Sequence, residues 1–215
     1  MKVIYEEILK EFVSKERPQL LHPFGVEGYY MASDTYRLVA IPKSLVELDL
    51  EHVEDKVSRR SVELIHTPPN QSLVFKTEDL LKKIGAQIAM VDEMDDSNVK
   101  ECPKCKGGGD IECFACGHIR ECDECRGPGE IGRAVPTGHK IPDPDQRMLI
   151  NGVLFRARLF TSVIKSANKL NQENVEWLVY DKGGANIFKA GDVSFVCMSI
   201  MQHAAEGETY GAIVI

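Results

Sequence analysis

Three pairs of cysteines, each spaced Cys-x-x-Cys, lie within one short segment and constrain this chain more than any other feature. The pairs begin at Cys102, Cys113 and Cys122, and they hold six of the seven cysteines in 215 residues. The N-terminal segment carries charges at every helical turn, so it lacks the apolar stretch of a secretory signal. Cysteine pairs without such a signal are typical of metal sites rather than disulfides, and we expect a reducing, cytoplasmic location.

The two outer pairs share the longer form CxxCxGxG and are separated by sixteen residues, which lies in the range of a zinc ribbon. A Cys-x-x-Cys turn lets two thiolates reach one ion, and glycine after the second cysteine permits a left-handed backbone. We therefore predict a zinc site formed by four thiolates, those of Cys102, Cys105, Cys122 and Cys125.

The middle pair leaves the number of zinc ions open. Cys113, Cys116 and His118 are three candidate ligands of a second site, and His139 is a candidate for the fourth. A catalytic zinc also uses three protein ligands, but the His-x-Glu of the zinc deaminases is absent. Free buried thiols are the remaining alternative, although so short a segment has few apolar residues with which to fold without metal.

The flanking regions are predicted to mix helices and strands. Before the cysteines we expect a helix over 2–14, strands over 25–32, 36–41, 61–66 and 73–75, and a helix over 77–84 that Thr77 caps and Gly85 ends. The segments 92–101 and 126–147 are predicted to be an acidic linker and a loop. After them we expect a strand over 148–155, a helix over 157–170, and strands over 174–181, 185–189 and 193–200.

This order suggests an α+β domain whose second half runs strand–helix–strand–strand–strand and whose first half is a degraded copy of it. We predict two βαβββ-type units, residues 1–95 and 148–215, with a zinc-binding insertion over 96–147. In the last three strands Trp177, Tyr180, Phe188 and Phe195 are expected to pack in the core, and Cys197 is expected to be a buried structural thiol.

The cysteine segment resembles the cysteine-rich region of J-domain co-chaperones over residues 102–129. That family has four such repeats and this chain has three, the middle one altered. The His-Pro-Asp tripeptide of a J-domain is missing, since Phe24 follows His22-Pro23. The resemblance implies a similar zinc fold and, as an alternative function, a zinc hairpin that grips polypeptide.

The flanks resemble a second family. The segment from Met31 to Leu38 is similar to the Ala-Thr-Asp-Gly-x-Arg-Leu hairpin of bacterial sliding clamps, with Thr35 where that family usually has glycine. The strand expected over 193–200 is also clamp-like, although Ser199 replaces the proline that often follows the methionine in clamps. This resemblance implies a clamp-type domain that acts as a non-enzymatic processivity or repair factor on DNA.

A local basic patch agrees with that implication in a chain whose formal net charge is −7. Arg158, Lys165 and Lys169 share one face of the helix expected over 157–170, and no acidic residue occurs between Met148 and Gln172. Such charges are also typical of a solvated helix face. The candidate functions are therefore a zinc-stabilised, clamp-like DNA accessory factor, a protein-binding module with a zinc hairpin, and a zinc hydrolase or deaminase.

Overall fold

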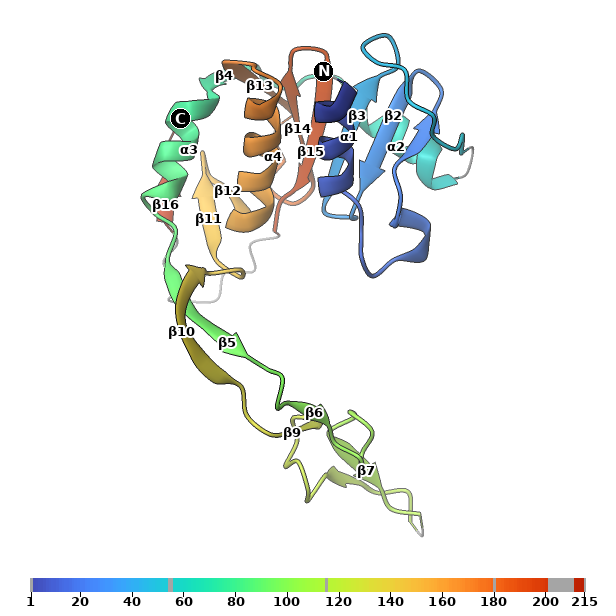
Figure 1. Ribbon diagram of the computed structural model, residues 1–215, viewed down its shortest axis with the longest axis vertical. Helices are drawn as coiled ribbons and strands as arrows, with labels where there is room; N and C mark the ends of the chain where they lie inside the picture. Colours follow the sequence, from blue (N-terminus) through green and yellow to red (C-terminus); the bar gives the residue numbers. More distant parts are fainter. Residues whose placement is uncertain (1, 54–55, 115, 180, 201–210, 215) are drawn as a thin grey trace. The chain divides into compact units, whose positions relative to one another are not determined.

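The computed structural model describes residues 2–53, 56–114, 116–179, 181–200 and 211–214 (Figure 1). The chain divides into two compact units, Met1–Ile88 with Pro144–Ile215 as unit 1 and Ala89–Asp143 as unit 2. Within the described residues there are four α helices and sheets that are mostly antiparallel, so the expected α+β class is confirmed. The division into two βαβββ units stays a prediction.

A seven-stranded antiparallel sheet forms the centre of unit 1, in the order β1-β2-β3-β15-β14-β13-β4. Its strands are β1 (Phe24–Val26), β2 (Tyr29–Ser33), β3 (Arg37–Pro42), β4 (Leu73–Lys76), β13 (Asn174–Val179), β14 (Ala185–Ala190) and β15 (Val193–Met198). Strands from both ends of the chain therefore pair side by side, at β3 and β15. This pairing joins the two flanks of unit 2 into one folded body.

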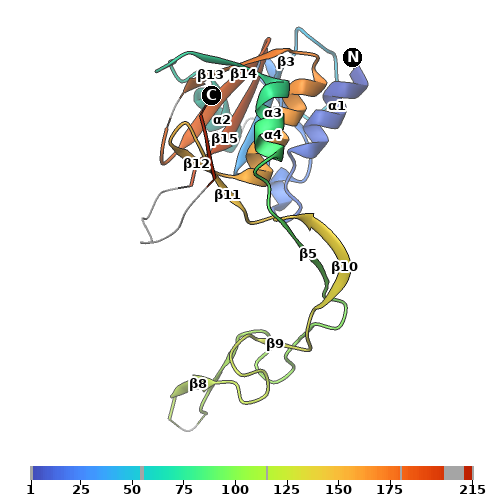
Figure 2. The same cartoon turned by 90° about the vertical axis from the view of Figure 1, so that its left-hand side faces the viewer.

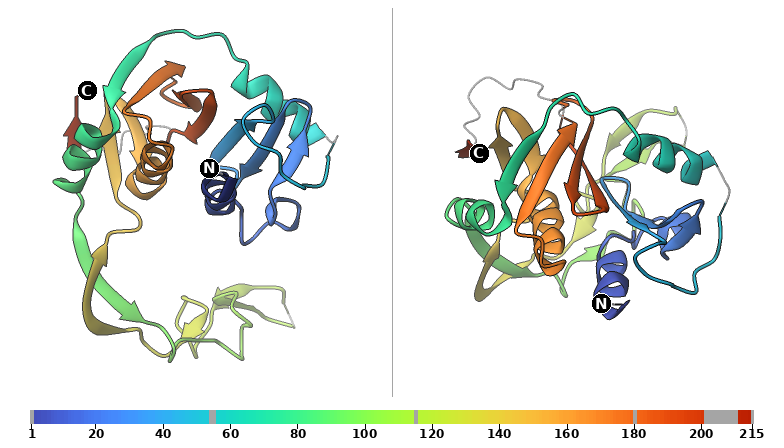
Figure 3. Two further views of the ribbon diagram at one scale, coloured as in Figure 1. Left: turned by 45° about the horizontal axis from the view of Figure 1, so that its top comes forward. Right: turned by 90° about the horizontal axis from the view of Figure 1, so that it is seen from above.

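Helices cover both faces of this sheet (Figures 2 and 3). Three of them pack on one face, namely α1 (Lys2–Glu11), α3 (Thr77–Gly85) and α4 (Ala157–Lys169), whereas α2 (Lys56–Ile65) packs on the other. Side chains alternate between the two faces along a strand, so Val39 and Ile41 join the core under the three helices, while Leu38 joins the core under α2. The 3-10 helix Pro18–Leu20 adds Leu20 to this second core.

A smaller three-stranded sheet completes unit 1. Its strands are β11 (Arg147–Ile150), β12 (Val153–Arg156) and β16 (Gly211–Ile213), and β16 runs parallel to β11. The turn between β11 and β12 is Asn151-Gly152, with φ of 46° and 81°. Two successive left-handed residues are what a type I′ hairpin turn requires.

Unit 2 consists of three short antiparallel pairs of strands. They are β5 (Met90–Asp95) with β10 (Val135–Pro142), β6 (Lys100–Glu101) with β9 (Glu130–Ile131), and β7 (Asp110–Glu112) with β8 (Ile119–Glu121). The amide of Asp143 donates to the carbonyl oxygen of Ala89 at 2.9 Å. The first and last residues of unit 2 are therefore joined directly to each other.

The strand expected over 61–66 is wrong, because this segment belongs to α2. The residues that α2 turns toward the sheet follow helical spacing, with Ser58 and Ser61 buried and Val62 and Ile65 half-buried. Two of these four are serines, so the apolar periodicity that would have indicated a helix is broken.

Two expected strands are hairpins. The strand expected over 25–32 is divided into β1 and β2 by a turn in which Gly28 has a φ of 75°. The strand expected over 148–155 is divided into β11 and β12. The expected linker 92–101 and loop 126–147 are also wrong in part, since β5 and β10 pair there in a ribbon that is exposed on both faces and so lacks apolar alternation.

The predicted caps of α3 are wrong as well. Thr77 is the first helical residue rather than the cap, and its hydroxyl lies within hydrogen-bond distance of Asn168 Oδ1 at 3.1 Å and of the carbonyl oxygens of Gln172 and Glu173 at 3.3 Å. Gly85 lies inside the helix, and Ala86 is the C-cap. The Thr77 hydroxyl thus ties α3 to the end of α4.

Candidate metal centre

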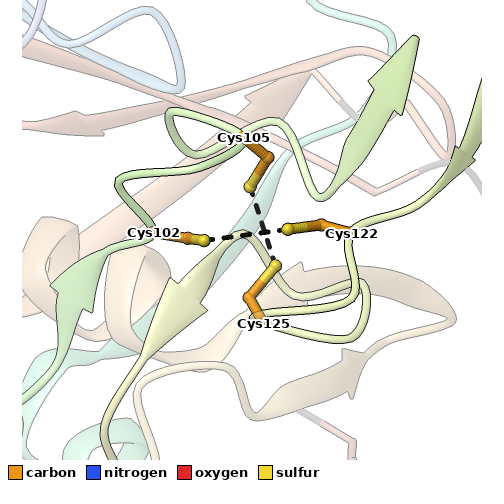
Figure 4. Close-up of side chains that lie close together, drawn as sticks. All are labelled: Cys102, Cys105, Cys122 and Cys125. Atoms are coloured by element: carbon orange, nitrogen blue, oxygen red, sulfur yellow. Dashed lines mark hydrogen bonds between the residues drawn. The ribbon is translucent and has the colours of Figure 1, made fainter. Parts of the chain in front are cut away.

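Four cysteines converge in unit 2, two from each outer Cys-x-x-Cys pair (Figure 4). The sulfur atoms of Cys102 and Cys122 are 3.8 Å apart, those of Cys105 and Cys125 are 3.6 Å apart, and all four lie within 4.8 Å of one another. Zinc–sulfur bonds of 2.3 Å in a tetrahedron place neighbouring sulfurs about 3.8 Å apart, whereas a disulfide requires about 2.05 Å. The spacing therefore fits a tetrahedral ion and excludes a disulfide.

The two outer pairs are related by a near two-fold arrangement of backbone hydrogen bonds. The amide of Cys102 donates to Gly129 O and that of Cys122 donates to Gly109 O, both at 2.8 Å. Within each turn the amide four residues on donates back to the first cysteine, from Lys106 at 2.8 Å and from Arg126 at 2.7 Å. Each turn thus fixes the geometry of the other, and both hold their thiols toward one point.

The glycines of the CxxCxGxG form are explained by this contact. Gly109 and Gly129 have φ of 76° and 79°, and a Cβ atom on either would lie 2.2 Å from the carbonyl oxygen of Gly127 or Gly107, respectively. A side chain is therefore excluded both by backbone conformation and by space. The sequence pattern requires glycine where the two turns touch.

The backbone also prepares one thiol for a metal. The amides of Cys125 and Glu124 lower the pKa of Cys122 to about 7, because they donate to its sulfur. Burial raises the pKa of Cys105 to about 11. A divalent cation at the centre would favour the thiolate form of all four, as zinc does when it displaces protons from cysteine.

An ion pair joins the two turns at the surface. Lys104 Nζ lies 2.7 Å from Asp123 Oδ1, and this contact raises the pKa of Lys104 and lowers that of Asp123. Both side chains are about half exposed, so this pair contributes little to stability beside the four thiols.

The middle Cys-x-x-Cys pair does not join this cluster. Cys113 is half-buried and Cys116 is exposed in the turn between β7 and β8, and His118 is exposed beside them. In the part of the chain that the structure describes, three or more potential metal ligands converge at one place, the four outer cysteines. His139 lies exposed on β10. A second site at Cys113, Cys116 and His118 stays a prediction.

The predicted basic residues all lie on the exposed side of α4. Arg158 and Lys165 are exposed there. Lys169 forms an ion pair with Glu11 of α1, whose other carboxylate oxygen accepts from the Ser166 hydroxyl at 3.0 Å. The ammonium of Lys169 is therefore partly neutralised, which the sequence of α4 alone did not indicate.

The hairpin that resembles the clamp motif is held by its own charged residues. Asp34 Oδ2 accepts from Arg37 Nε at 2.9 Å and from Nη2 at 2.6 Å, and Arg37 also donates to Ser162 of α4 and stacks on the Phe12 ring at 4.8 Å. Thr35 has a φ of 77°, the left-handed conformation that glycine adopts most readily. It stands where the clamp motif usually has glycine.

A groove of about 380 Å³ lies between this hairpin, α2 and β15. Apolar side chains of Leu38, Leu64, Val196 and Met198 line it, together with Tyr36. The remaining lining residues are Ser33, Thr35, Arg37, Arg60 and Ser61. The sequence does not indicate this groove, because it predicts a strand over 61–66, whereas Ser61 and Leu64 line the groove from helix α2.

The predicted core residues are buried in unit 1. Trp177, Phe188 and Phe195 are fully buried, and Tyr180 lies outside the described residues. Trp177 and Phe188 pack with ring centroids 5.1 Å apart. Cys197 is also fully buried, as expected of a structural thiol, and this burial raises its pKa to about 12.

Comparison with known proteins gives similarity to solved structures only. No protein-family model and no curated protein matches the chain. The DNA polymerase III beta subunit of Pseudomonas aeruginosa is 11% identical with a TM-score of 0.47, and the match covers 94% of this chain and 65% of that one. The sliding clamp of Bacillus subtilis is also 11% identical, with a TM-score of 0.46 and coverage of 94% and 63%.

The chain therefore spans slightly less than two thirds of the length of these clamps. The resemblance of the cysteine segment to J-domain co-chaperones stays a prediction. Among the described residues, no helix is both long enough and apolar enough to cross a membrane.

Proposed function

We propose that this chain is a zinc-stabilised binding protein without catalytic activity, which serves as a clamp-like accessory factor in DNA replication or repair. The observation that carries the structural, non-catalytic role of zinc is the four-cysteine cluster. Four thiolates fill the coordination shell of zinc and leave no position for water or substrate, which is typical of a structural rather than a catalytic site.

The clamp-like part of the proposal is supported by the hairpin from Met31 to Leu38. Its resemblance to the clamp motif extends to backbone conformation, since Thr35 is left-handed where the motif has glycine. Its Arg37, which is bonded to Asp34 of the same hairpin, donates to Glu11 of α1 and to Ser162 of α4. Helices α1, α3 and α4 share one face of the sheet, and the clamp resemblance implies that such a face turns toward DNA.

DNA binding through α4 is expected to be weak and independent of sequence. Arg158 and Lys165 offer two phosphate contacts, and Lys169 adds a third only if its ion pair with Glu11 opens. Each contact contributes a slope of about −0.9 to a log–log plot of affinity against salt, so we expect about −2 for the native chain. Glu11→Gln should free Lys169 and steepen this slope to about −3.

The test is a titration of double-stranded and single-stranded DNA at low salt with the full chain. Changing Arg158, Lys165 and Lys169 to Glu should abolish binding. A matched variant with Glu at Arg59, Lys182 and Lys189, which carries the same total charge, should bind more strongly than this triple variant. No binding at about 100 μM protein, or equal binding by the two triple variants, would remove the DNA role.

A second candidate function, docking of a protein partner, is favoured by the groove beside the hairpin. Its apolar walls suit one or two aliphatic or aromatic side chains, and Arg60 at its edge suits an acidic group on the same segment. We propose that it holds a short, extended apolar and acidic peptide segment of a replication or repair protein.

A random peptide library displayed on phage tests this role. We expect enrichment of peptides that combine a large apolar residue with an acidic one. Leu64→Asp should weaken the selected peptides at least tenfold, because it places a charge in the apolar wall, which is a change of about 1.4 kcal/mol or more. Val74→Asp, at an exposed position of β4, is the control and should leave binding unchanged. If the affinity of the selected peptides is unchanged by Leu64→Asp, the docking site lies elsewhere on the protein.

A further inference from the structure

The middle cysteine pair forms a turn with the same local geometry as the two outer pairs. The amide of Gly117 donates to Cys113 O at 2.8 Å, as Lys106 and Arg126 donate to the first cysteines of their turns. Gly117 has a φ of 69°, and Lys106 and Arg126 are left-handed too, at 51° and 56°. We call the described residues Cys113, Phe114 and 116–118 the tip knuckle, since they lie between β7 and β8.

The outer site shows what such a turn needs in order to bind an ion. Two knuckles face each other across a near two-fold axis, and each supplies two of the four sulfurs. Four of the seven cysteines are used there, and Cys197 is fully buried in unit 1. This chain therefore offers two thiols at the tip knuckle, whereas tetrahedral zinc takes four ligands.

His118 does not complete the set as a third convergent ligand among the described residues. Its carbonyl oxygen accepts from the amide of Cys113 at 2.8 Å, so His118 acts as the closing residue of the hairpin. The tip also presents apolar surface to solvent. Phe114 is fully exposed and Ile119 is 66% exposed, which is unusual for large apolar side chains so close together.

We propose that the tip knuckle is half of a second zinc site, which Cys113 and Cys116 of a second copy of this chain complete. Two-fold symmetry between copies reproduces the facing arrangement that the outer knuckles adopt within one chain. The same contact brings the two exposed Phe114 side chains into a shared apolar surface. Because the amide of Cys113 is already bonded within its own hairpin, the ion and not the backbone supplies most of the attraction.

Charge makes the association depend on the ion. Glu112 is the last residue of β7 and lies next to the tip knuckle, so two tips without metal bring its like charges together. A zinc ion between four thiolates offsets that repulsion, because it forms two zinc–sulfur bonds to each chain. The complex is therefore a dimer with three zinc ions, that is 1.5 per chain.

The test follows the mass and zinc content of the full chain during a zinc titration, with a phosphine reductant present to prevent disulfides. We expect a monomer of 24.0 kDa up to one equivalent and a species of twice that mass at 1.5 equivalents. A chelator should reverse the doubling. When cobalt replaces zinc, the absorption band of tetrahedral thiolate coordination should grow by about one half between one and 1.5 equivalents of metal per chain.

Variants separate this proposal from its alternatives. The double change of Cys113 and Cys116 to Ser should stay monomeric with one zinc per chain, and His118→Ala should dimerise like the native chain. A native monomer with one zinc at every concentration would overturn the proposal. So would a monomer with two, which would mean a site closed within one chain, or a dimer that survives the double serine change.

Discussion

Replacement of Cys125 by Ser is expected to unfold about residues 102–129 and to leave unit 1 folded. Among the described residues of the cysteine segment, the buried side chains are Cys102, Cys122 and Cys125, with Cys105, Ile111 and Ile131 packed against them. These residues form no apolar core that could replace the ion. Zinc binding contributes about 10–16 kcal/mol to the folding of such segments. Losing one thiolate should therefore remove the structure and not merely loosen it.

The chain provides a separate signal for each unit. Its single tryptophan, Trp177, is fully buried in unit 1, so its fluorescence reports on that unit alone. Amide spectra of residues 102–129 should collapse to the unfolded range while Trp177 emission stays unchanged. Cys116→Ser is the matched control and should keep both signals. If residues 102–129 of the Cys125→Ser variant stay folded without metal, the four-thiolate site does not hold this segment together. If the Trp177 emission shifts to the red, unit 1 depends on the segment and the two units are not separate.

The second large effect is expected from Gly129→Ala. The added Cβ would lie 2.2 Å from Gly107 O, and it would sit on a backbone with a φ of 79°. Overpacking by one methyl group destabilises a fold by about 1–3 kcal/mol. The left-handed conformation costs a residue with a Cβ about 1–2 kcal/mol more. Together they should weaken zinc binding by roughly 30- to 5,000-fold.

Gly138→Ala is the control for the same substitution at a left-handed glycine outside the knuckles. Gly138 has a φ of 85°, but nothing lies within 4 Å of its added Cβ, and it belongs to β10 rather than to the knuckles. Competition with a coloured chelator should show native affinity for this variant. Equal affinities for the two alanine variants would mean that the contact between the knuckles does not set zinc binding.

The sequence predicted best where one local signal is sufficient. The apolar spacing of Leu159, Phe160, Val163 and Ile164 predicts α4 because all four side chains face the sheet. The sequence predicted poorly where a strand is identified only by its pairing with a segment far away in the chain. The ribbon of β5 and β10 is exposed on both faces, so only pairing across about 40 residues identifies its strands.

Two features of the structure have a local signal in the sequence. Asn151-Gly152 is a strong indicator of a two-residue hairpin, and it divides the strand expected over 148–155. The left-handed Thr35 follows from its place in the clamp-like motif. By contrast, the ion pair between Lys169 and Glu11 joins α4 to α1 over 158 positions and has no local signal.

The joined ends of unit 2 link the metal to the way in which the rest of the chain folds. Unit 1 cannot bring Gln146 to its hydrogen bond with Gln87 until the 55 intervening residues of unit 2, Ala89–Asp143, have been brought back on themselves. A folded unit 2 presents those ends already bonded, from Asp143 to Ala89, so the polymer that unit 1 must close is shortened to a few residues. By the logarithmic dependence of loop entropy on length, this difference is about 2 kcal/mol. The supply of zinc would then govern the rate at which unit 1, whose described residues hold no converging group of metal ligands, reaches its native state.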